Sequence, residues 1–286
     1  MTPQDTEFRV ENTQGRDQTD STGWSASLYN KTASFVYSPA FTASVLDLLA
    51  AQPGERILDV GCGSGEVTLR IQEMVEQKKG GVVVGTDFSE SMIKQAKANG
   101  IRQVFVADAQ NLEFPKDKPE YMEKFDGVFS NAALHWCKRD PLGVLIGVRK
   151  VLKPGGRIAV EMGGYMNCIG IRSALHDVVR SKGRDPEEID PWYFPSMEDY
   201  VKLLITAGFE PTHMSLTPRI TPLPTGLYDW LNIFVRNSFL REFSDEEASE
   251  IMREVEDRCR VDCRDASGKW AMMYTRLRFS AILKDE

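Results

Sequence analysis

The chain has 286 residues, of which 42% are hydrophobic and 27% are charged. This length accommodates one large α/β domain with an inserted cap, and the composition is that of a soluble globular protein rather than a disordered or fibrous one. The formal net charge of −7 disfavours a nucleic-acid partner, because a protein that neutralises phosphates needs a basic face. The sequence contains no run of 18 apolar residues, so no membrane span is expected.

The cysteines favour a cytoplasmic protein. There are five, scattered along the chain, as expected for free thiols in a reducing compartment. The amino end is polar and acidic, which does not fit a secretory signal. Cys259 and Cys263 lie one helical turn apart, but no histidine or further cysteine pair stands near them in sequence, so no metal site is expected. Residues 1–22 have few apolar side chains and predict a disordered tail.

Between residues 54 and 162, short apolar runs alternate with segments of helical spacing. Helix signals are an apolar stripe over 67–75, a start near Ser89, and Asp140 followed by Pro141. Strand, helix and strand in this order imply parallel pairing with right-handed crossovers, and hence an open doubly wound sheet. The strands of this region are predicted at 56–60, 81–85, 103–107, 125–130 and 156–161.

After the fifth strand the pattern becomes mainly helical. It predicts helices over 168–178, 196–207 and twice within 227–259, the last opened by a capping box at Ser244. A sixth strand at 209–217, a Pro-rich link at 217–224 and a last strand at 276–284 complete the pattern. The expected fold is α/β, with a doubly wound, mostly parallel seven-stranded sheet. We expect a core of residues 23–221 and 271–286, with a helical cap at 222–270 inserted between the last two strands.

The glycine-rich segment after the first strand is the strongest functional signal. An apolar strand, 57–60, breaks into Gly61, Gly63 and Gly65 and then opens a helix. Ligands of open α/β sheets bind at the carboxyl ends of the strands, and glycines let a ligand approach the backbone. The dinucleotide fingerprint Gly-x-Gly-x-x-Gly is not met, because Glu66 stands at its sixth position, where a carboxylate fits a diphosphate badly.

The pattern Asp-Val-Gly-x-Gly-x-Gly, which begins at Asp59, resembles the first motif of class I S-adenosylmethionine-dependent methyltransferases, which have a Rossmann-like fold. The resemblance implies that this loop packs against the methionyl part of S-adenosylmethionine, and that Asp108 and Ala109 contact the adenine. Asp87 follows the second strand, where an acidic residue accepts the ribose hydroxyls of a nucleoside. The expected cofactor-binding residues are Asp59, Gly61, Cys62, Gly63, Gly65, Asp87, Phe88, Met92, Asp108, Ala109 and Asn131.

Further segments resemble the trans-aconitate methyltransferase group of small-molecule methyltransferases. The resemblance implies O-methylation of a carboxylic acid as the expected reaction and an acceptor pocket walled by Tyr29, His135 and Trp136. It leaves the identity of the acceptor and the oligomeric state open. The segments that carry it are Trp24, Tyr29 and Phe35 before the first strand, and the stretches 130–136, 153–156 and 276–279.

The acceptor decides whether a catalytic base is needed. A carboxylic acid is ionised at pH 7 and needs none, whereas a phenol, an alcohol or a carbon acid needs one. His135 follows the fourth strand at the expected crevice and is the best candidate for a catalytic base. The alternatives are therefore a C- or N-methyltransferase of a specialised metabolite that uses His135 as base, or a cofactor-binding relative without transfer activity.

Four arginines offer positive charge to an anionic acceptor. Arg219, Arg236, Arg276 and Arg278 lie in or beside the expected cap, and a guanidinium group pairs bidentately with a carboxylate. Arg276 and Arg278 share one face of the last strand. For this pair a solvated surface is the more common explanation.

Overall fold

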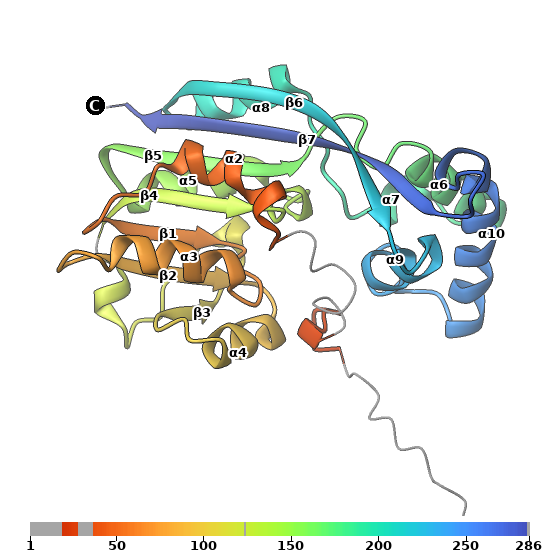
Figure 1. Cartoon of the computed structure of the whole chain (residues 1–286), viewed down its shortest axis with the longest axis horizontal. Coiled ribbons are helices and arrows are strands. Elements are labelled where there is room, and N and C mark those ends of the chain that lie inside the picture. The colour runs from red at the N-terminus through yellow and green to blue at the C-terminus, as the bar shows by residue number, and fades with distance from the viewer. Residues whose placement is uncertain (1–18, 28–36, 123, 285–286) are drawn as a thin grey trace, which may run out of the picture.

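The structure, a computed structural model, describes residues 19–27, 37–122 and 124–284. In these residues seven strands form one sheet with the order β3-β2-β1-β4-β5-β7-β6 (Figure 1). Strands β1 to β5 are parallel, and β7 runs antiparallel to both β5 and β6. The predicted mostly parallel seven-stranded α/β fold is confirmed. The strands are β1 Arg56–Val60, β2 Val82–Asp87, β3 Val104–Val106, β4 Phe125–Asn131, β5 Leu152–Gly163, β6 Phe209–Leu223 and β7 Trp270–Leu283.

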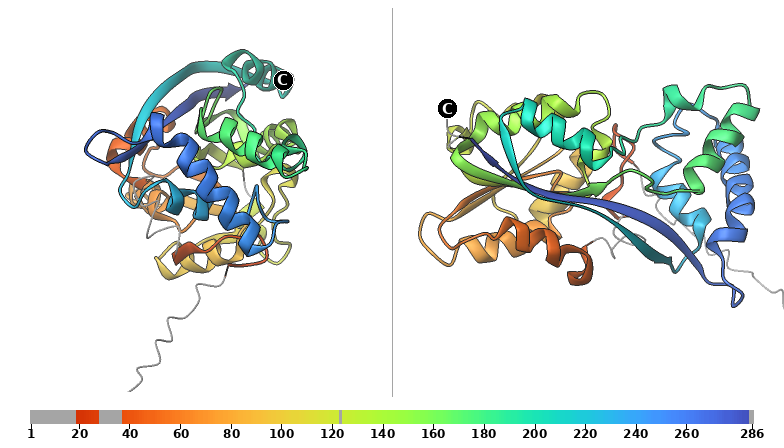
Figure 2. Two further views of the ribbon diagram at one scale, coloured as in Figure 1. Left: turned by 90° about the vertical axis from the view of Figure 1, so that its right-hand side faces the viewer. Right: turned by 90° about the horizontal axis from the view of Figure 1, so that it is seen from above.

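Helices cover both faces of the sheet, as the view from above in Figure 2 shows. On one face, Val45 of α2 and Ile71 of α3 are buried in a cluster with Ile57 of β1. On the other, Leu145 of α5 and Leu204 of α8 share a second cluster with strand residues. These helices are α2 Pro39–Leu49, α3 Glu66–Val75, α4 Glu90–Ala98, α5 Pro141–Val151 and α8 Met197–Thr206, with short 3-10 turns η2 Ala109–Asn111, η3 Pro119–Met122 and η4 Leu134–Trp136.

Helices begin where the predicted capping residues stand. The Oγ of Ser89 and a carboxylate oxygen of Asp140 each accept the backbone N–H three residues further on, at 3.1 Å and 2.7 Å. Ser244 and Glu247 form the predicted capping box at the start of α10, Asp245–Cys263. These side chains satisfy N–H groups that lack partners in the first turn of a helix.

The last two strands are longer than predicted. Residues 217–223 continue β6 instead of forming a link, and β7 begins at Trp270 rather than at 276. Pro218 and Pro222 pair with Thr275 and Ala271 in the ladder. Proline lacks an N–H donor, but β6 is an edge strand, where one side of the strand needs no donor, so prolines are tolerated there.

The long ribbon of β6 and β7 leads from the sheet to a lobe of helices at the right of Figure 1. Helices α9 and α10 follow β6 and precede β7, as the expected cap requires, and they share a hydrophobic cluster with α6. The boundaries 222–270 remain a prediction, to which we add α6 and α7 as a proposed part of the cap. None of the described helices is long and apolar enough to cross a membrane. The helices of this lobe are α6 Ile171–Ser181, α7 Pro186–Ile189, α9 Leu227–Phe234 and α10.

Candidate active site

The glycine loop between β1 and α3 requires glycine at three positions. Gly61, Gly63 and Gly65 have φ angles of 78°, 56° and 92°, in the left-handed region that other residues rarely adopt. A Cβ atom on Gly61 would also lie 2.1 Å from the Cβ of Ala133. The loop after β1 therefore packs directly against the segment after β4, at the switch point of the sheet.

Asp87, the last residue of β2, holds the glycine loop. Its Oδ2 accepts a hydrogen bond from the N–H of Gly63, and its Oδ1 accepts one from the N–H of Ser89, both at 2.9 Å. Removal from water raises the pKa of Asp87, although the two N–H groups counteract this. Each carboxylate oxygen keeps a lone pair that a further donor, such as a ribose hydroxyl, can use.

A second carboxyl group, that of Asp59, lies behind the loop. Only 2% of Asp59 is exposed, and its Oδ2 accepts a hydrogen bond from the hydroxyl of Thr68 at 2.7 Å. Burial raises the pKa of Asp59 to about 7; the charge of Asp87 adds to this and the Thr68 bond opposes it. Two interacting carboxyl groups with raised pKa values favour a positively charged ligand, because a cation stabilises their ionised forms.

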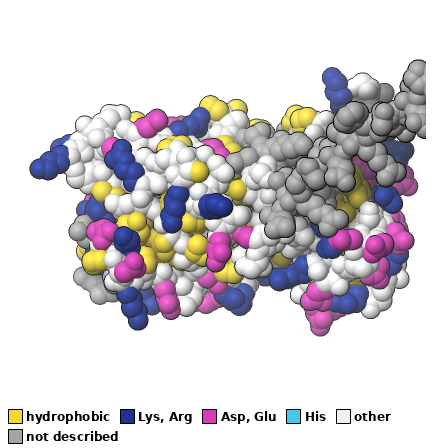
Figure 3. All heavy atoms as spheres, turned by 90° about the horizontal axis from the view of Figure 1, so that it is seen from below, with side chains coloured by type: hydrophobic (Ala, Val, Ile, Leu, Met, Phe, Trp, Pro, Cys, Tyr) yellow, Lys and Arg dark blue, Asp and Glu magenta, His cyan; other side chains and the backbone are white. Residues whose placement is uncertain are grey.

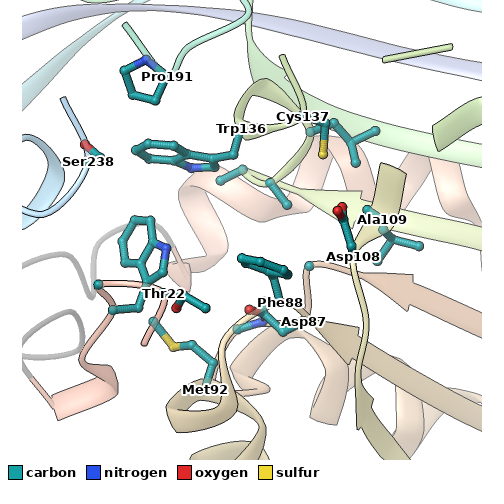
Figure 4. Close-up of a pocket in the computed structure, with 18 of the residues that line it drawn as sticks. Thr22, Asp87, Phe88, Met92, Asp108, Ala109, Trp136, Cys137, Pro191 and Ser238 are labelled. Carbon is teal, nitrogen blue, oxygen red and sulfur yellow. The ribbon is translucent and has the colours of Figure 1, made fainter. Parts of the chain in front are cut away.

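These groups open on one cavity of about 550 Å³, the main cavity, whose volume is typical of small-molecule sites. Figure 4 shows Asp87, Phe88 and Asp108 pointing into it from the ends of β2 and β3, with Trp136 opposite them. Gly65 does not line it, because its α-carbon faces Ile101. The predicted cofactor residues that do line it are Asp59, Gly61, Cys62, Gly63, Asp87, Phe88, Met92, Asp108, Ala109 and Asn131.

Asp108 is an ionised carboxylate at the edge of the main cavity. Its partial burial raises the pKa, but the N–H of Gln110, at 2.9 Å, and the guanidinium of Arg139 outweigh this effect and lower it. The carboxylate therefore remains an acceptor at neutral pH. Its predicted contact with the adenine amino group stays a prediction.

Residues 19–27 contribute to the site in a way that composition did not predict. Residues 1–18 of the expected tail lie outside the described residues, but Asp20 accepts a hydrogen bond from the N–H of Ser91 at 3.0 Å, at the start of α4. Trp24 meets Trp136 edge to face, with ring centroids 5.2 Å apart, and both rings line the main cavity. Residues 22–24 thus form part of the wall of the main cavity. The polar composition of these residues does not predict the contact between Asp20 and Ser91, which lie about 70 residues apart in sequence.

His135 does not line the main cavity. It is 8% exposed and borders a smaller cavity of about 50 Å³, the side cavity. Its Nδ1 accepts a hydrogen bond from the N–H of Gly163 at 3.3 Å, and burial, followed by the charge of Arg276, lowers its pKa well below the usual value. With Nδ1 occupied as acceptor, Nε2 carries the proton, so neither nitrogen has a lone pair for proton abstraction. This geometry argues against His135 as the general base.

Trp136 lines both cavities and separates them. It remains a candidate wall of the acceptor pocket. Tyr29 and Phe35 lie outside the described residues.

The expectation of a solvated face for Arg276 and Arg278 is wrong. Both contact Glu161 of β5, and only 6% of Arg276 and 1% of Glu161 are exposed. Arg219 joins the same carboxylate, at 3.4 Å. The pairing of β7 with β5 brings these side chains together, with 20% or less of each side chain exposed. The fourth arginine, Arg236, instead pairs with Asp245 at the start of α10.

Comparison with known proteins places this geometry in a family. Residues 58–160, which include the glycine loop and the ends of β1 to β4, match the family model described as a methyltransferase domain. The chain is 35% identical over 266 residues to an uncharacterised methyltransferase of Schizosaccharomyces pombe, covering 90% of this chain and 97% of that protein. The fold is similar to the crystal structure of a candidate methyltransferase from Bacillus halodurans, with a TM-score of 0.59, 18% identity, and 86% and 100% of the two chains covered.

The predicted resemblance to small-molecule methyltransferases is also found. The chain is 33% identical over 116 residues to the trans-aconitate 2-methyltransferase of Deinococcus radiodurans, covering 40% of each protein. The similarity to the S. pombe protein extends over almost the whole of both chains. The chain belongs to the family of S-adenosylmethionine-dependent methyltransferases.

Proposed function

We propose that the protein methylates a carboxylate oxygen of a small organic acid. The observation that carries this proposal is the composition of the wall around Trp136. In the described residues this wall contains Arg219 and Arg276, which share Glu161 with Arg278, and its histidine has no lone pair available as a base. An ionised acid suits such a wall, because it is attracted by the arginines and needs no proton removed.

The main cavity fits the cofactor. Asp59 and Asp87 supply negative charge for a cationic ligand, and the exposed ring of Phe88 offers a stacking surface beside Asp108. In the same wall, the Oγ1 of Thr86 is buried and has no hydrogen-bond partner among the described residues. A ligand donor or acceptor at this atom would satisfy it.

When bound, S-adenosylmethionine supplies a methyl group on a sulfonium, which an acceptor oxygen takes in one in-line displacement that leaves a neutral thioether. The chain's contribution is positioning and the exclusion of water. Asp87 fixes the glycine loop, and Trp24 and Trp136 close part of the cavity with aromatic surface. Aromatic faces also attract cations, so these rings suit a sulfonium nearby.

The surface supports a small acceptor rather than a nucleic acid. On the face seen from below in Figure 3, basic and acidic side chains of the described residues are interspersed, without a continuous basic area. The net charge of the chain is −7. Its five cysteines are free and buried, and on this basis we also propose a cytoplasmic location.

The experiment is methyl transfer with a chemically resolved product. Protein and S-adenosylmethionine carrying an isotopic label in its methyl group are incubated with a panel of mono-, di- and tricarboxylic acids, phenols and amines. A methyl ester releases labelled methanol in mild alkali, whereas N-methyl and C-methyl products do not. We expect alkali-labile label on an acid, and roughly 10- to 150-fold less of it with Asp87→Ala at S-adenosylmethionine concentrations below saturation. Label found only in an alkali-stable product, or no transfer to any acid, contradicts the proposal.

A further inference from the structure

The three arginines and Glu161 are brought together by the register of the last strands. Glu161 of β5 stands opposite Arg278 of β7, and Tyr274 of β7 stands opposite Arg219 of β6. Residues directly opposite in an antiparallel pair, and residues two apart along one strand, lie on the same face of a sheet. Arg219, Arg276, Arg278 and Glu161 therefore share one face, beside the end of β5.

Glu161 is fully occupied by these arginines. Its Oε1 accepts hydrogen bonds from Nε of Arg276 at 3.2 Å and Nη1 of Arg219 at 3.4 Å. Its Oε2 accepts two bonds from Arg278, at 2.9 and 2.6 Å. The bidentate bond to Arg278 alone neutralises the glutamate. Arg219 and Arg276 are thus surplus to the ion pair.

The surplus arginines keep donors for another acceptor. Within the described residues, Arg276 donates to Glu161 through Nε only, which leaves its two terminal amino groups, and the Nε of Arg219 is buried without a partner. Both side chains line the side cavity. Arg219 is held in place by the ring of Phe41, whose centroid lies 4.0 Å from its Cζ. The donors are therefore fixed before any ligand binds.

The net positive charge of the three arginines and Glu161 favours the binding of an anion. Three guanidinium groups face one carboxylate, which leaves two positive charges in a region where only 7% of the Arg276 side chain and 19% of the Arg219 side chain are exposed. Unpaired buried charge is costly, and a carboxylate bonded by two guanidinium groups relieves that cost. Burial and the neighbouring charge of Arg276 lower the pKa of Arg219, because both make its positive charge less favourable.

The side cavity is sized for one small group. Its volume of about 50 Å³ is less than a tenth of the main cavity, so it holds a carboxylate and not a whole acceptor. The two cavities share Ala132 and Trp136 in their walls. An acceptor anchored in the side cavity would have to pass Trp136, at the boundary of the two cavities, to reach the main cavity.

We propose that Arg219 and Arg276 bind, in the side cavity, a carboxylate of the acceptor other than the one that is methylated. The inference rests on the proposed function and names the class of acid, one with at least two carboxylates. The anchored carboxylate is not the one that is methylated, because hydrogen bonds from two guanidinium groups to its oxygen atoms make it a weaker nucleophile. Arg219 would then determine specificity without contacting the transferred methyl group.

The first test measures binding without turnover. Calorimetry with tricarballylate, a tricarboxylate, is done in the presence of S-adenosylhomocysteine on the wild type, Arg219→Met, Arg219→Lys and the control Arg258→Met, a surface change on α10. Arg258 pairs with Glu254 and lies outside both cavities. We expect at least tenfold weaker binding for Arg219→Met, partial recovery for Arg219→Lys and no change for Arg258→Met. Unfolding of the ligand-free Arg219→Met should need as much denaturant as the wild type or more, since Glu161 keeps two arginines.

The second test uses an acid that proves to be methylated. Arg219→Met should raise KM for a dicarboxylate at least tenfold with kcat within threefold, and leave KM for a monocarboxylate unchanged. An equal rise in KM for both acids would mean that Arg219 holds the reacting carboxylate, which overturns the inference. Destabilised ligand-free Arg219→Met with unchanged tricarballylate binding would make the cluster purely structural, and also overturns it.

The two proposals fail separately. If tricarballylate binding depends on Arg219 but no acid is methylated, the anion site stands and the proposed function falls. If acids are methylated equally well by Arg219→Met, the proposed function stands and the anion site falls.

Discussion

The carboxylate of Asp87 and the backbone N–H of Gly63 are joined by a hydrogen bond of 2.9 Å, which ties the end of β2 to the loop after β1. The two strands are parallel neighbours, so their carboxyl ends meet at one edge of the sheet. The same carboxylate holds the N–H of Ser89, at the start of α4. One side chain thus sets the shape of the loop and the entry to a helix, and residues of both line the main cavity.

Asp87→Ala should weaken the binding of S-adenosylmethionine by about 1.5–3 kcal/mol, roughly 10- to 150-fold, because hydrogen bonds to a charged group are lost. Titration calorimetry measures this directly. Asp87→Asn, which keeps one acceptor oxygen, should lie between the wild type and the alanine variant. Asp257→Ala, on the surface of α10, serves as the control. Unchanged affinity in Asp87→Ala would remove Asp87 from the cofactor site.

Gly61→Ala should destabilise the fold by about 3 kcal/mol or more, since the new methyl group would meet Ala133 and the residue has a positive φ. Gly155→Ala is the matched control. Its φ is 69° and a Cβ there meets nothing within 4 Å, so only the backbone cost of about 1–2 kcal/mol applies. Urea unfolding of both variants separates the cost of the contact with Ala133 from the backbone cost of a positive φ. Equal losses would mean that contact with Ala133 is relieved by movement.

The pKa of Asp59 predicts a pH-dependent stability. Its pKa is about 7 in the folded protein, above the value of about 3.9 of an unfolded chain. Between these values the folded state binds the extra proton, so the free energy of unfolding falls as pH rises from 4 to 7 and levels off above 7. Asp59→Asn keeps an acceptor for Thr68 and removes the titration.

The stability lost by the wild type between pH 5 and pH 8 should therefore exceed the loss in Asp59→Asn by roughly 2–4 kcal/mol. Denaturant unfolding of both proteins at the two pH values measures the difference. Asp87, whose pKa is also raised, remains in both proteins and does not account for it. Parallel pH profiles for the two proteins would show that Asp59 is ionised throughout.

Activity should not depend on a base at His135. His135→Asn retains an acceptor near the position of Nδ1 for the N–H of Gly163, and we expect its kcat to stay within about tenfold of the wild type, whereas loss of a general base costs about 10²- to 10⁴-fold. The wild-type kcat should be flat from pH 6 to pH 8.5. A wild-type kcat that rises with pH, with a midpoint in this range, and that loses this pH dependence in His135→Asn would show that His135 acts as a base.

Local signals in the sequence were sufficient to predict helices that begin at contacts between residues close together in the chain. Ser89 and Asp140 cap helices through bonds to residues three positions away. Asp87 and Gly63 meet because strands joined by a helix pair side by side in parallel. Gly65 belongs to the same motif, yet it supports packing against Ile101 rather than the cavity, a difference that a linear pattern does not encode.

From the sequence alone follow the order of strands and helices, the glycine loop and the acidic residues at the strand ends, because each depends on local propensity and on the few topologies open to alternating strands and helices. Tertiary structure decided the rest. Glu161 meets Arg219, Arg276 and Arg278 across 58, 115 and 117 residues, and the prolines of β6 stay in the sheet because β6 lies at its edge. Such contacts depend on the register of the strands and on burial within the whole fold, which cannot be predicted from a short stretch of sequence.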